Sequence, residues 1–356
     1  MLRYEGARHF RQRIILATLS GKAVRIDNIR ADDAEQPGLR DFEVSLLRLL
    51  ESVVNGCEIV INAAGTGVRF RPGAIIGGVV THDCPPSRGV GYFVEALLML
   101  APFAKMPLVA TLRGVTNDEH TTGVDAIRTV TLPLMRKFGL DEGLDLKIVK
   151  RGALPNGGGE VELRCPVVRK LGSIDLIDEG KVKRVRGVAF ATRVAPHVAN
   201  RMVETARGVL NDFLPDVWLY TDHYKGERGG ASPGFGLTVV AESTTGSMIC
   251  VELNGGAQML PEDVGQSAAR LLCEEIANGG YVDTAHQPLA LLLMALGPED
   301  VSRIRIGKVS QYTIEWLRLL RDFLGVTMHL KPDPSTMSVV VTCRGVGYSN
   351  IARRAI

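Results

Sequence analysis

The stretch RIILATLSGKAVRIDNIRA (residues 13–31) has a counterpart in VEALLMLAPFAKMPLVATLRG (residues 94–114). Each stretch predicts an apolar helix, a short break that contains a lysine, and then a strand in which apolar side chains alternate. The two lysines, Lys22 and Lys105, are 83 positions apart. This spacing indicates an internal repeat, which determines the fold before any single motif does.

An amphipathic helix follows in both copies, over residues 42–53 and 127–138, with apolar side chains at helical spacing. These helices are expected to end at Gly56 and Gly139, again 83 positions apart. Glycine is favoured there because it readily adopts the left-handed conformation that follows a helix. Two strand-like runs come next, so each copy is predicted to be an α-β-α-β-β unit.

A third copy covers residues 288–345, and its second helix is expected to end before Gly325. That glycine comes 186 positions after Gly139, where the period predicts 83. We therefore expect an insertion between about Leu171 and His286. Its patterns predict helices at residues 196–210 and 262–277, and strands at residues 217–221, 236–243 and 248–253.

The predicted elements give the expected fold class, α/β (α+β). Three repeats form the core, which we expect at residues 1–183 and 258–356, and a smaller α+β domain is inserted at residues 184–257. The inserted lobe is expected to move relative to the core, because its two ends leave and re-enter the core between repeats. Its Gly-rich loop, residues 226–234, is the expected site of proteolysis.

Composition limits the kind of partner. The chain has 356 residues, and 42 Lys and Arg against 39 Asp and Glu leave a net charge of only +3. This balance excludes a nucleic-acid packaging protein, so any RNA contact must come from local patches. Six scattered cysteines without a C-x-x-C pair argue against zinc and disulfides and favour the cytosol or nucleus. The longest apolar run, residues 289–296, is far below the roughly 20 residues that span a bilayer, so no membrane contact is expected.

The densest run of positive charge lies where the core passes into the insertion. It consists of Lys181, Lys183, Arg184, Arg186 and Arg193. A charge run is usually a solvated face, and here it is also a candidate for binding RNA phosphate or an acidic segment of a partner.

A second charged surface is expected on the helix over residues 313–324. Arg318 and Asp322 are spaced i, i+4, which favours a surface salt bridge between them. Arg321 has no obvious partner within the helix, and arginine is common among the anchors of protein interfaces. We expect Arg321, with Arg318 and Asp322 beside it, to contact a protein partner.

The motif RGALPNGGGEV (residues 151–161) resembles the signature of the RNA 3′-terminal phosphate cyclase superfamily. The core of that superfamily is likewise a three-fold α/β repeat with a small inserted domain. The resemblance covers nearly the whole chain and includes SGKAVRIDNIRA (residues 20–31), RFRPG (residues 69–73) and SPGFGLTVVAES (residues 232–243). The Gly-rich part of the motif, residues 156–159, has two interpretations: a loop that holds a phosphate with its N–H groups, or a structural hairpin with positive φ.

The resemblance fails at the catalytic positions. Cyclases adenylate a histidine, and the matching stretch here is Ser-Gln-Tyr-Thr at residues 310–313, with no histidine between His286 and His329. A serine or tyrosine hydroxyl would need a nearby base before it could accept AMP. His286 has two interpretations, a displaced nucleophile or, as we favour, a solvated residue at the start of a helix.

The polar groups around the nucleophile are also largely replaced. The cyclases' Gly-rich loop Glu-Gly-Gly-Gly-Gln is reduced to Ala-Arg-His-Phe at residues 7–10. Only Arg11, Arg40 and Gln287 retain the polar character that the resemblance implies. We expect Arg11, Arg40 and Arg151 to bind RNA or another anion, together with the basic segment at residues 181–193. No catalytic residue, metal site or cofactor is expected.

These departures resemble the eukaryotic cyclase-like branch of the superfamily. The branch implies a nuclear and nucleolar component of the small-subunit processome that binds a ribosome-assembly GTPase and pre-rRNA and is required for pre-18S rRNA processing. We expect such a non-catalytic factor, although the sequence leaves the question of enzyme activity open. The alternatives are an endonuclease that itself cleaves pre-rRNA, which would usually need a cluster of carboxylates around metal ions, and a residual RNA 3′-phosphate cyclase.

Overall fold

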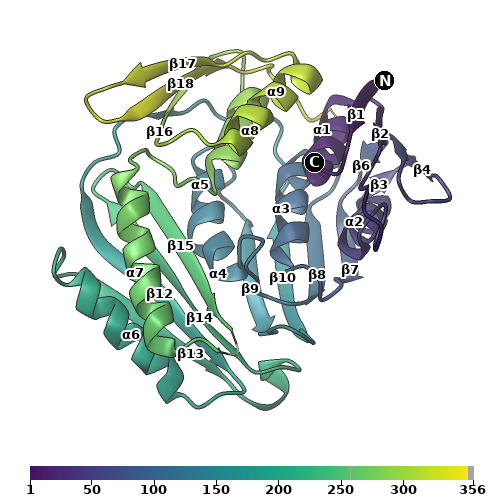
Figure 1. Cartoon of the computed structure of the whole chain (residues 1–356). Coiled ribbons are helices and arrows are strands. Elements are labelled where there is room, and N and C mark those ends of the chain that lie inside the picture. The colour runs from purple at the N-terminus through teal and green to yellow at the C-terminus, as the bar shows by residue number, and fades with distance from the viewer. Residues whose placement is uncertain (257, 352–356) are drawn as a thin grey trace.

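The computed structural model describes residues 1–256 and 258–351 and contains three four-stranded sheets of identical topology (Figure 1). In each sheet the first two strands are parallel and the remaining neighbours are antiparallel. The sheets are, in spatial order, β1 (Leu2–Glu5), β2 (Val24–Asp27), β5 (Val68–Arg71) and β4 (Glu58–Ile61); β7 (Gly78–Asp83), β8 (Leu108–Gly114), β10 (Gly159–Cys165) and β9 (Asp145–Lys150); and β11 (Asp175–Leu176), β16 (Val301–Ile306), β18 (Ser338–Arg344) and β17 (His329–Asp333). The predicted three-fold repeat is confirmed.

Each repeat has one strand more than the sequence pattern predicts. The true unit is β-α-β-α-β-β, because β1, β7 and β11 precede the first helices and pair in parallel with β2, β8 and β16. These leading strands have two to six residues. A run that short gives little periodic signal, and its position becomes fixed only by pairing with a strand that is distant in sequence.

The first helix of each repeat is buried in the centre of the molecule. These helices are α1 (Phe10–Ser20), α3 (Gly91–Leu100) and α8 (Gln287–Leu296). All ten residues of α8 are buried. A helix that is apolar all round can be stable only when it is enclosed on every side, and here α1 packs against α3, while α8 packs against the second helix of its own repeat.

The second helices are amphipathic and cover the outside of this centre. They are α2 (Asp41–Val53) and α9 (Gln311–Leu324), and in the second repeat the chain divides into α4 (Val124–Ala126), the π-helical turn η2 (Ile127–Thr131) and α5 (Leu132–Arg136). Short elements complete the core, namely β3 (Val54–Asn55), β6 (Ala74–Ile75) and the 3₁₀ turn η1 (Ala101–Phe103).

The inserted segment forms a fourth sheet with the strand order β13-β12-β14-β15. Its elements are β12 (Val182–Thr192), α6 (His197–Leu210), β13 (Val217–Tyr224), the 3₁₀ turn η3 (Gly226–Gly229), β14 (Gly234–Ser243), β15 (Met248–Gly255) and α7 (Pro261–Ala277). The strand β12 was not expected: the basic segment at residues 181–193 is largely this strand, whose charged side chains conceal the strand pattern.

Both helices of the insertion pack on the same face of its sheet (Figure 1). Residues of α7 and α6 share one apolar cluster with β12 and β14. The two helices approach so closely that a Cβ on Gly265 would lie 2.3 Å from the carbonyl oxygen of Met202. We propose that the inserted unit extends from about Val182 to Ala277, beyond the limit at residue 257 that the sequence pattern predicts.

A buried guanidinium joins this unit to the second repeat. Arg151 is 1% exposed and makes a two-pronged ion pair with Asp125 at 2.5 and 2.8 Å, while a further bond of 3.0 Å reaches Asp222 on β13. Its guanidinium carbon lies 4.7 Å from the ring centre of Phe190 on β12. The pair with Asp125 lies within the second repeat, and the bond to Asp222 crosses to the insertion, so Arg151 links the two.

The Gly-rich loop of the insertion is tied to the same junction. The N–H of Arg151 donates to the carbonyl of Arg228, and the N–H of Ala231 donates to that of Gly157. The buried Ser232 hydroxyl accepts from the N–H of Asn156. These bonds do not fit the expected free, protease-sensitive loop, because cleavage there would first require the junction to open.

We predict that Arg151→Ala destabilises the protein by about 3–5 kcal/mol, because it leaves the carboxylate of Asp125 buried without a partner. The midpoint of urea unfolding measures this loss. The matched control is Arg164→Ala on β10, where an exposed arginine pairs only with Glu162; its effect should stay below about 1 kcal/mol. An Arg151→Ala protein with the midpoint of the unmodified chain would contradict the assigned role.

Candidate functional site

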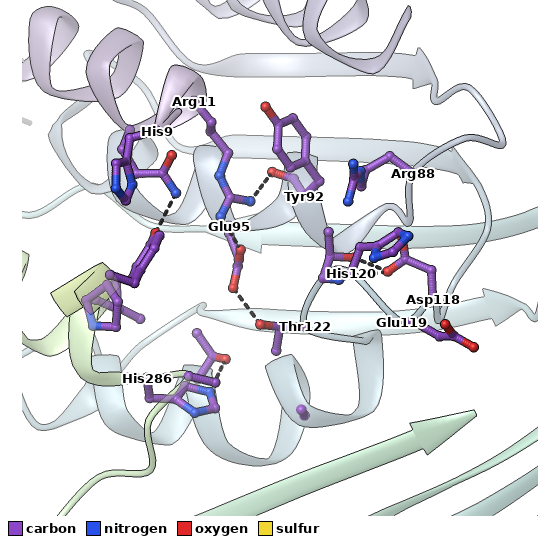
Figure 2. A pocket seen from close by; sticks show the side chains of 18 of the residues that line it. His9, Arg11, Arg88, Tyr92, Glu95, Asp118, Glu119, His120, Thr122 and His286 are labelled. Carbon is purple, nitrogen blue, oxygen red and sulfur yellow. Dashed lines mark hydrogen bonds and ion pairs between the residues drawn. The ribbon is translucent and has the colours of Figure 1, made fainter. Parts of the chain in front are cut away.

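A cavity of about 880 Å³ lies where the three repeats and the inserted sheet meet. The starts of α1 and α3 and the chain just before α8 all contribute to its wall, as do the loop after β8, the end of β15 and the start of α9. Figure 2 shows how side chains from these elements point toward one another. The repeats bring the same end of their central helices together, so one cavity receives residues from all three.

Arg11 and Glu95 form an ion pair across the cavity at 2.7 Å. Arg11 also donates to the carbonyl of Tyr92 at 2.9 Å and lies 4.5 Å from the centre of its ring, and Thr122 donates to the other oxygen of Glu95 at 2.7 Å. Burial opposes the charge of Arg11, but Glu95 outweighs it and the pKa of Arg11 is raised. An anion that binds Arg11 would therefore compete with a carboxylate already in place.

The residues that replace the cyclase loop and nucleophile lie side by side. Gln12 donates to the Tyr312 hydroxyl at 2.6 Å, and the rings of His9 and Tyr312 have centres 4.8 Å apart. Burial raises the pKa of Tyr312, so its hydroxyl keeps its proton near neutral pH. Ser310 caps α9 by accepting from the N–H of Thr313 at 3.1 Å. Within residues 1–256 and 258–351, neither hydroxyl is hydrogen-bonded to a carboxylate or imidazole of the kind that activates a nucleophile.

The short turn at residues 7–10 is fixed to α9. His9, in the left-handed conformation with φ 56°, lies 2.7 Å from Glu315 through its Nε2 atom. Arg8 approaches the same carboxylate at 2.8 Å. Burial lowers the pKa of His9 despite this carboxylate. The turn thus joins the first repeat to the third beside Tyr312.

His286 is buried, not solvated as expected. Its Nδ1 lies 2.6 Å from Asp283 and its Nε2 lies 2.9 Å from the Thr131 hydroxyl. Burial opposes the charged form, but Asp283 outweighs it and raises the pKa of His286. Both ring nitrogens therefore have hydrogen-bond partners inside the protein, and they fix the orientation of the ring.

Glu252 on β15 closes the cavity from the side of the insertion. It accepts from the N–H groups of Gly123 at 2.6 Å and Ala126 at 3.3 Å and from the Thr238 hydroxyl at 3.1 Å. Burial raises its pKa to about 7. Neither Glu252 nor Glu95 is predicted from the sequence. Glu95 does leave a signal, because it is the one charged residue in the apolar stretch GYFVEALLML.

Of the residues expected to bind RNA or an anion, only Arg11 lines the cavity. Arg40 pairs with Asp33 at 2.7 Å beside the start of α2. Arg151 lies buried at the junction and presents no surface to an RNA phosphate. In the Gly-rich turn, Gly157 and Gly158 have φ of 62° and 78°, and the N–H groups of Asn156 and Gly157 are bonded within the protein. These contacts favour the structural hairpin over the phosphate loop.

The basic segment is divided by the fold. Arg184 bonds to Glu242 at 2.7 Å, Arg186 forms a two-pronged pair with Asp216 at 2.8 and 3.0 Å, and Arg193 donates to the carbonyl of Gly230. Lys181 and Lys183 are exposed, and neither has an ion-pair partner in the part of the chain that the structure describes. The two lysines are therefore the free charges of this segment.

On α9 the expected salt bridge between Arg318 and Asp322 is replaced by other contacts. Asp322 lies 3.5 Å from Arg321 and accepts from the hydroxyl of Tyr4 at 3.3 Å. Across residues 1–256 and 258–351 no ion pair joins Arg318 to Asp322. Arg321 remains 61% exposed.

Metal sites and membrane-spanning helices are two further features that bear on function. Among the described residues, no group of three or more His, Cys, Asp and Glu side chains is arranged to hold a metal ion. Within the same residues, no helix has both the length and the apolar character to cross a membrane.

A sequence profile identifies the family. The profile, described as RNA 3′-terminal phosphate cyclase, matches residues 2–330. The chain belongs to this family.

Within the family, the chain is similar to proteins named cyclase-like. A "probable RNA 3′-terminal phosphate cyclase-like protein" of Dictyostelium discoideum is 53% identical over 369 residues, with 99% of each chain covered. The human RNA 3′-terminal phosphate cyclase-like protein is 50% identical over 364 residues, with 99% of this chain and 97% of the human protein covered. A Schizosaccharomyces pombe protein named "rRNA processing protein rcl1" is 45% identical over 356 residues, with 99% and 98% covered.

The raised pKa of Glu252 predicts that the free energy of unfolding depends on pH. Its pKa is about 7 when folded and near 4.5 as an unperturbed group, so the folded chain keeps a proton that the unfolded chain has released. The free energy of unfolding should therefore fall as pH rises from about 4.5 to 7, by on the order of 3 kcal/mol at most.

The variant Glu252→Gln should remove this fall, because its side chain carries no charge at either pH. Urea unfolding at pH 4.5 and 7.5 measures the difference, with the exposed Glu51→Gln as the control that keeps the slope of the unmodified chain. If Glu252→Gln and Glu51→Gln lose the same stability between the two pH values, Glu252 does not carry the effect.

Proposed function

We propose that this chain is a non-catalytic, cyclase-like factor in the processing of ribosomal RNA. The observation that carries the proposal is the state of the nucleophile position, where a protonated, hydrogen-bonded Tyr312 stands beside a capping Ser310. The name of the S. pombe relative, rRNA processing protein, supports the process. A cyclase without an AMP acceptor keeps a fold with large surfaces for binding, which suits a component of an assembly.

The finer proposal assigns the chain to the small-subunit processome in the nucleolus of the nucleus. There it binds a ribosome-assembly GTPase and pre-rRNA and is required for pre-18S rRNA processing. Depletion of the chain should accumulate pre-18S precursors, which a northern blot detects. Normal amounts of mature 18S rRNA after depletion would overturn this assignment.

We predict that the chain forms no covalent adenylate. Both ring nitrogens of His286 are hydrogen-bonded, and in the described part of the chain no hydrogen bond joins the Tyr312 hydroxyl to a carboxylate or imidazole. Incubation with labelled ATP and Mg²⁺, followed by acid precipitation, should leave no label on the protein. A labelled adduct that disappears in the His286→Ala variant would show that this histidine is a working nucleophile and would restore a cyclase reaction.

The GTPase contact is proposed to include Arg321. Its side chain is largely exposed on α9, and its one ion-pair partner among the described residues is Asp322, at 3.5 Å. The opposite side of α9, including Leu320, is buried in the core. A partner can therefore cover the guanidinium without disturbing the helix.

We predict that Arg321→Ala weakens binding of the GTPase by about 2 kcal/mol, or near thirtyfold. Its stability should change by no more than about 0.5 kcal/mol, since the truncation opens no cavity. Calorimetric titration measures the affinity and a thermal melt the stability. The exposed Arg48→Ala on α2 is the matched control and should bind normally, whereas Leu320→Ala should cost about 2–5 kcal/mol of stability. An Arg321→Ala protein with unchanged affinity would remove α9 from the proposed interface.

A further inference from the structure

The inserted sheet has one covered face and one that is partly open. Side chains alternate along β13, so Val217 and Leu219 are buried in the apolar cluster under α6 and α7. Trp218 and Tyr220 alternate with them and therefore point to the opposite face. Trp218 is 59% exposed and Tyr220 is 56% exposed. Large aromatic side chains that are this exposed are unusual on a soluble protein and mark contact sites.

Only part of this second face is available. At its other edge, Val240 on β14 and Cys250 on β15 pack against Ala126 and Val130 of the second repeat. Phe190, toward the end of β12, lies against Arg151. What stays open is the edge strand β13 with the beginning of β12, which is the segment furthest from the junction along these strands.

The open part combines aromatic and basic side chains. In the strand register, Trp218 is opposite Arg186 and Tyr220 is opposite Val188, while Arg184 follows on the same face of β12. Lys181, just before β12, and Lys183, at its start, are exposed. We call Lys181, Lys183, Arg184, Arg186, Trp218 and Tyr220 the β13 strip. With Asp216 and Glu242 as its two paired carboxylates, the strip keeps an excess of positive charge.

We infer that the β13 strip binds a single-stranded segment of RNA, whose bases stack on Trp218 and Tyr220 and whose phosphates meet Lys181 and Lys183. The inference rests on the proposed role in rRNA processing only for the class of ligand. Residues i and i+2 of a strand are roughly 6.6 Å apart, and the two ring centres are separated by 6.0 Å. Aromatic side chains at such positions on an open sheet are the usual platform for successive bases.

The aromatic side chains of the β13 strip favour single-stranded RNA over a duplex. In a double helix the base faces are stacked on one another, so they are not offered to a protein ring. The two arginines of the strip are already held by carboxylates, which leaves two free lysines for phosphates. Binding should therefore depend weakly on salt, with a log–log slope of about −1 to −2, at roughly −0.7 for each phosphate contact. A site that relies on phosphates alone would show a steeper slope.

The fluorescence of Trp218 can report binding of RNA to the β13 strip. Of its two tryptophans, Trp316 is fully buried and donates to the carbonyl of Pro288, so the exposed Trp218 is the one that a ligand can reach. Titration of the full-length protein with 12-nucleotide oligouridylate or oligoadenylate should quench the Trp218 emission. A 12-base-pair RNA duplex should leave it unchanged.

The variants Trp218→Ala and Tyr220→Ala should each weaken binding of the same fluorescein-labelled oligonucleotides about fivefold to 150-fold, the equivalent of about 1–3 kcal/mol per stacked base. Trp218→Phe should retain most of the affinity. The matched control is Phe213→Ala, since Phe213 is an exposed aromatic residue at the end of α6 and outside the strip. Because all three aromatic rings are exposed, thermal melting should be the same for every variant.

Three outcomes would overturn the inference: no binding of single-stranded RNA by the unmodified chain, equal binding of the duplex, or unchanged RNA affinity in the Trp218→Ala, Tyr220→Ala double variant. If that double variant kept its RNA affinity and lost the GTPase instead, the strip would be a protein-binding surface. None of these results alters the proposed role in rRNA processing, which the 18S precursors measure separately after depletion of the chain.

Discussion

Helices α1, α3 and α8 impose the constraint on which the rest of the structure depends, because most residues of each helix are buried and must be enclosed by neighbouring elements. A single repeat can cover one side of such a helix with its sheet and leaves the others exposed. Three repeats together enclose all three helices, which explains why the unit is repeated and why no copy is expected to be stable alone. The same arrangement brings the start of each central helix to one place. The cavity is thus a geometric consequence of how the core is buried.

Three basic groups at the cavity are paired with carboxylates before any ligand arrives. Arg11 is paired with Glu95, Arg30 with Glu43, and His286 with Asp283. Arg88 differs, since it lies over the ring of Phe42 and has no ion pair within the described residues. A site that binds a nucleotide phosphate would be expected to leave several cations uncompensated. Of the three pairs, Arg11 with Glu95 joins the first repeat to the second, and the other two each lie within one repeat, so the pairing stabilises the wall of the cavity.

Much of the fold follows from local patterns. The 83-residue spacing of Gly56 and Gly139 and the delayed third copy predict the repeat and the insertion, because amphipathic helices and nearby turn glycines are encoded by neighbouring residues. Contrary to the expectation from the sequence, Gly56 itself does not end α2 but follows the short strand β3. The leading strand of each repeat and β12 could not be predicted in this way. Their partners are distant in sequence, and the charged side chains at the start of β12 suppress the apolar alternation that identifies a strand. The expected pair of Arg318 and Asp322 also could not be tested from the local sequence. Asp322 instead contacts Arg321 and the hydroxyl of Tyr4, which is 318 positions away from it in the sequence.

In the candidate site, too, some features can be predicted from neighbouring residues and others depend on residues far away in the sequence. The loss of the histidine nucleophile is visible in residues 310–313 alone, since the identity of a side chain needs no structure. The buried state of His286 depends on Thr131, which is 155 positions away, and that of Glu252 depends on the backbone of Gly123. His286 joins the third repeat to the second repeat, and Glu252 joins the insertion to the second repeat. A polar group lost from catalysis can persist when it also fixes such a junction, because its removal would leave a buried partner unsatisfied. The surviving polar residues are therefore weak evidence for chemistry and stronger evidence for a structural role where the repeats and the insertion meet.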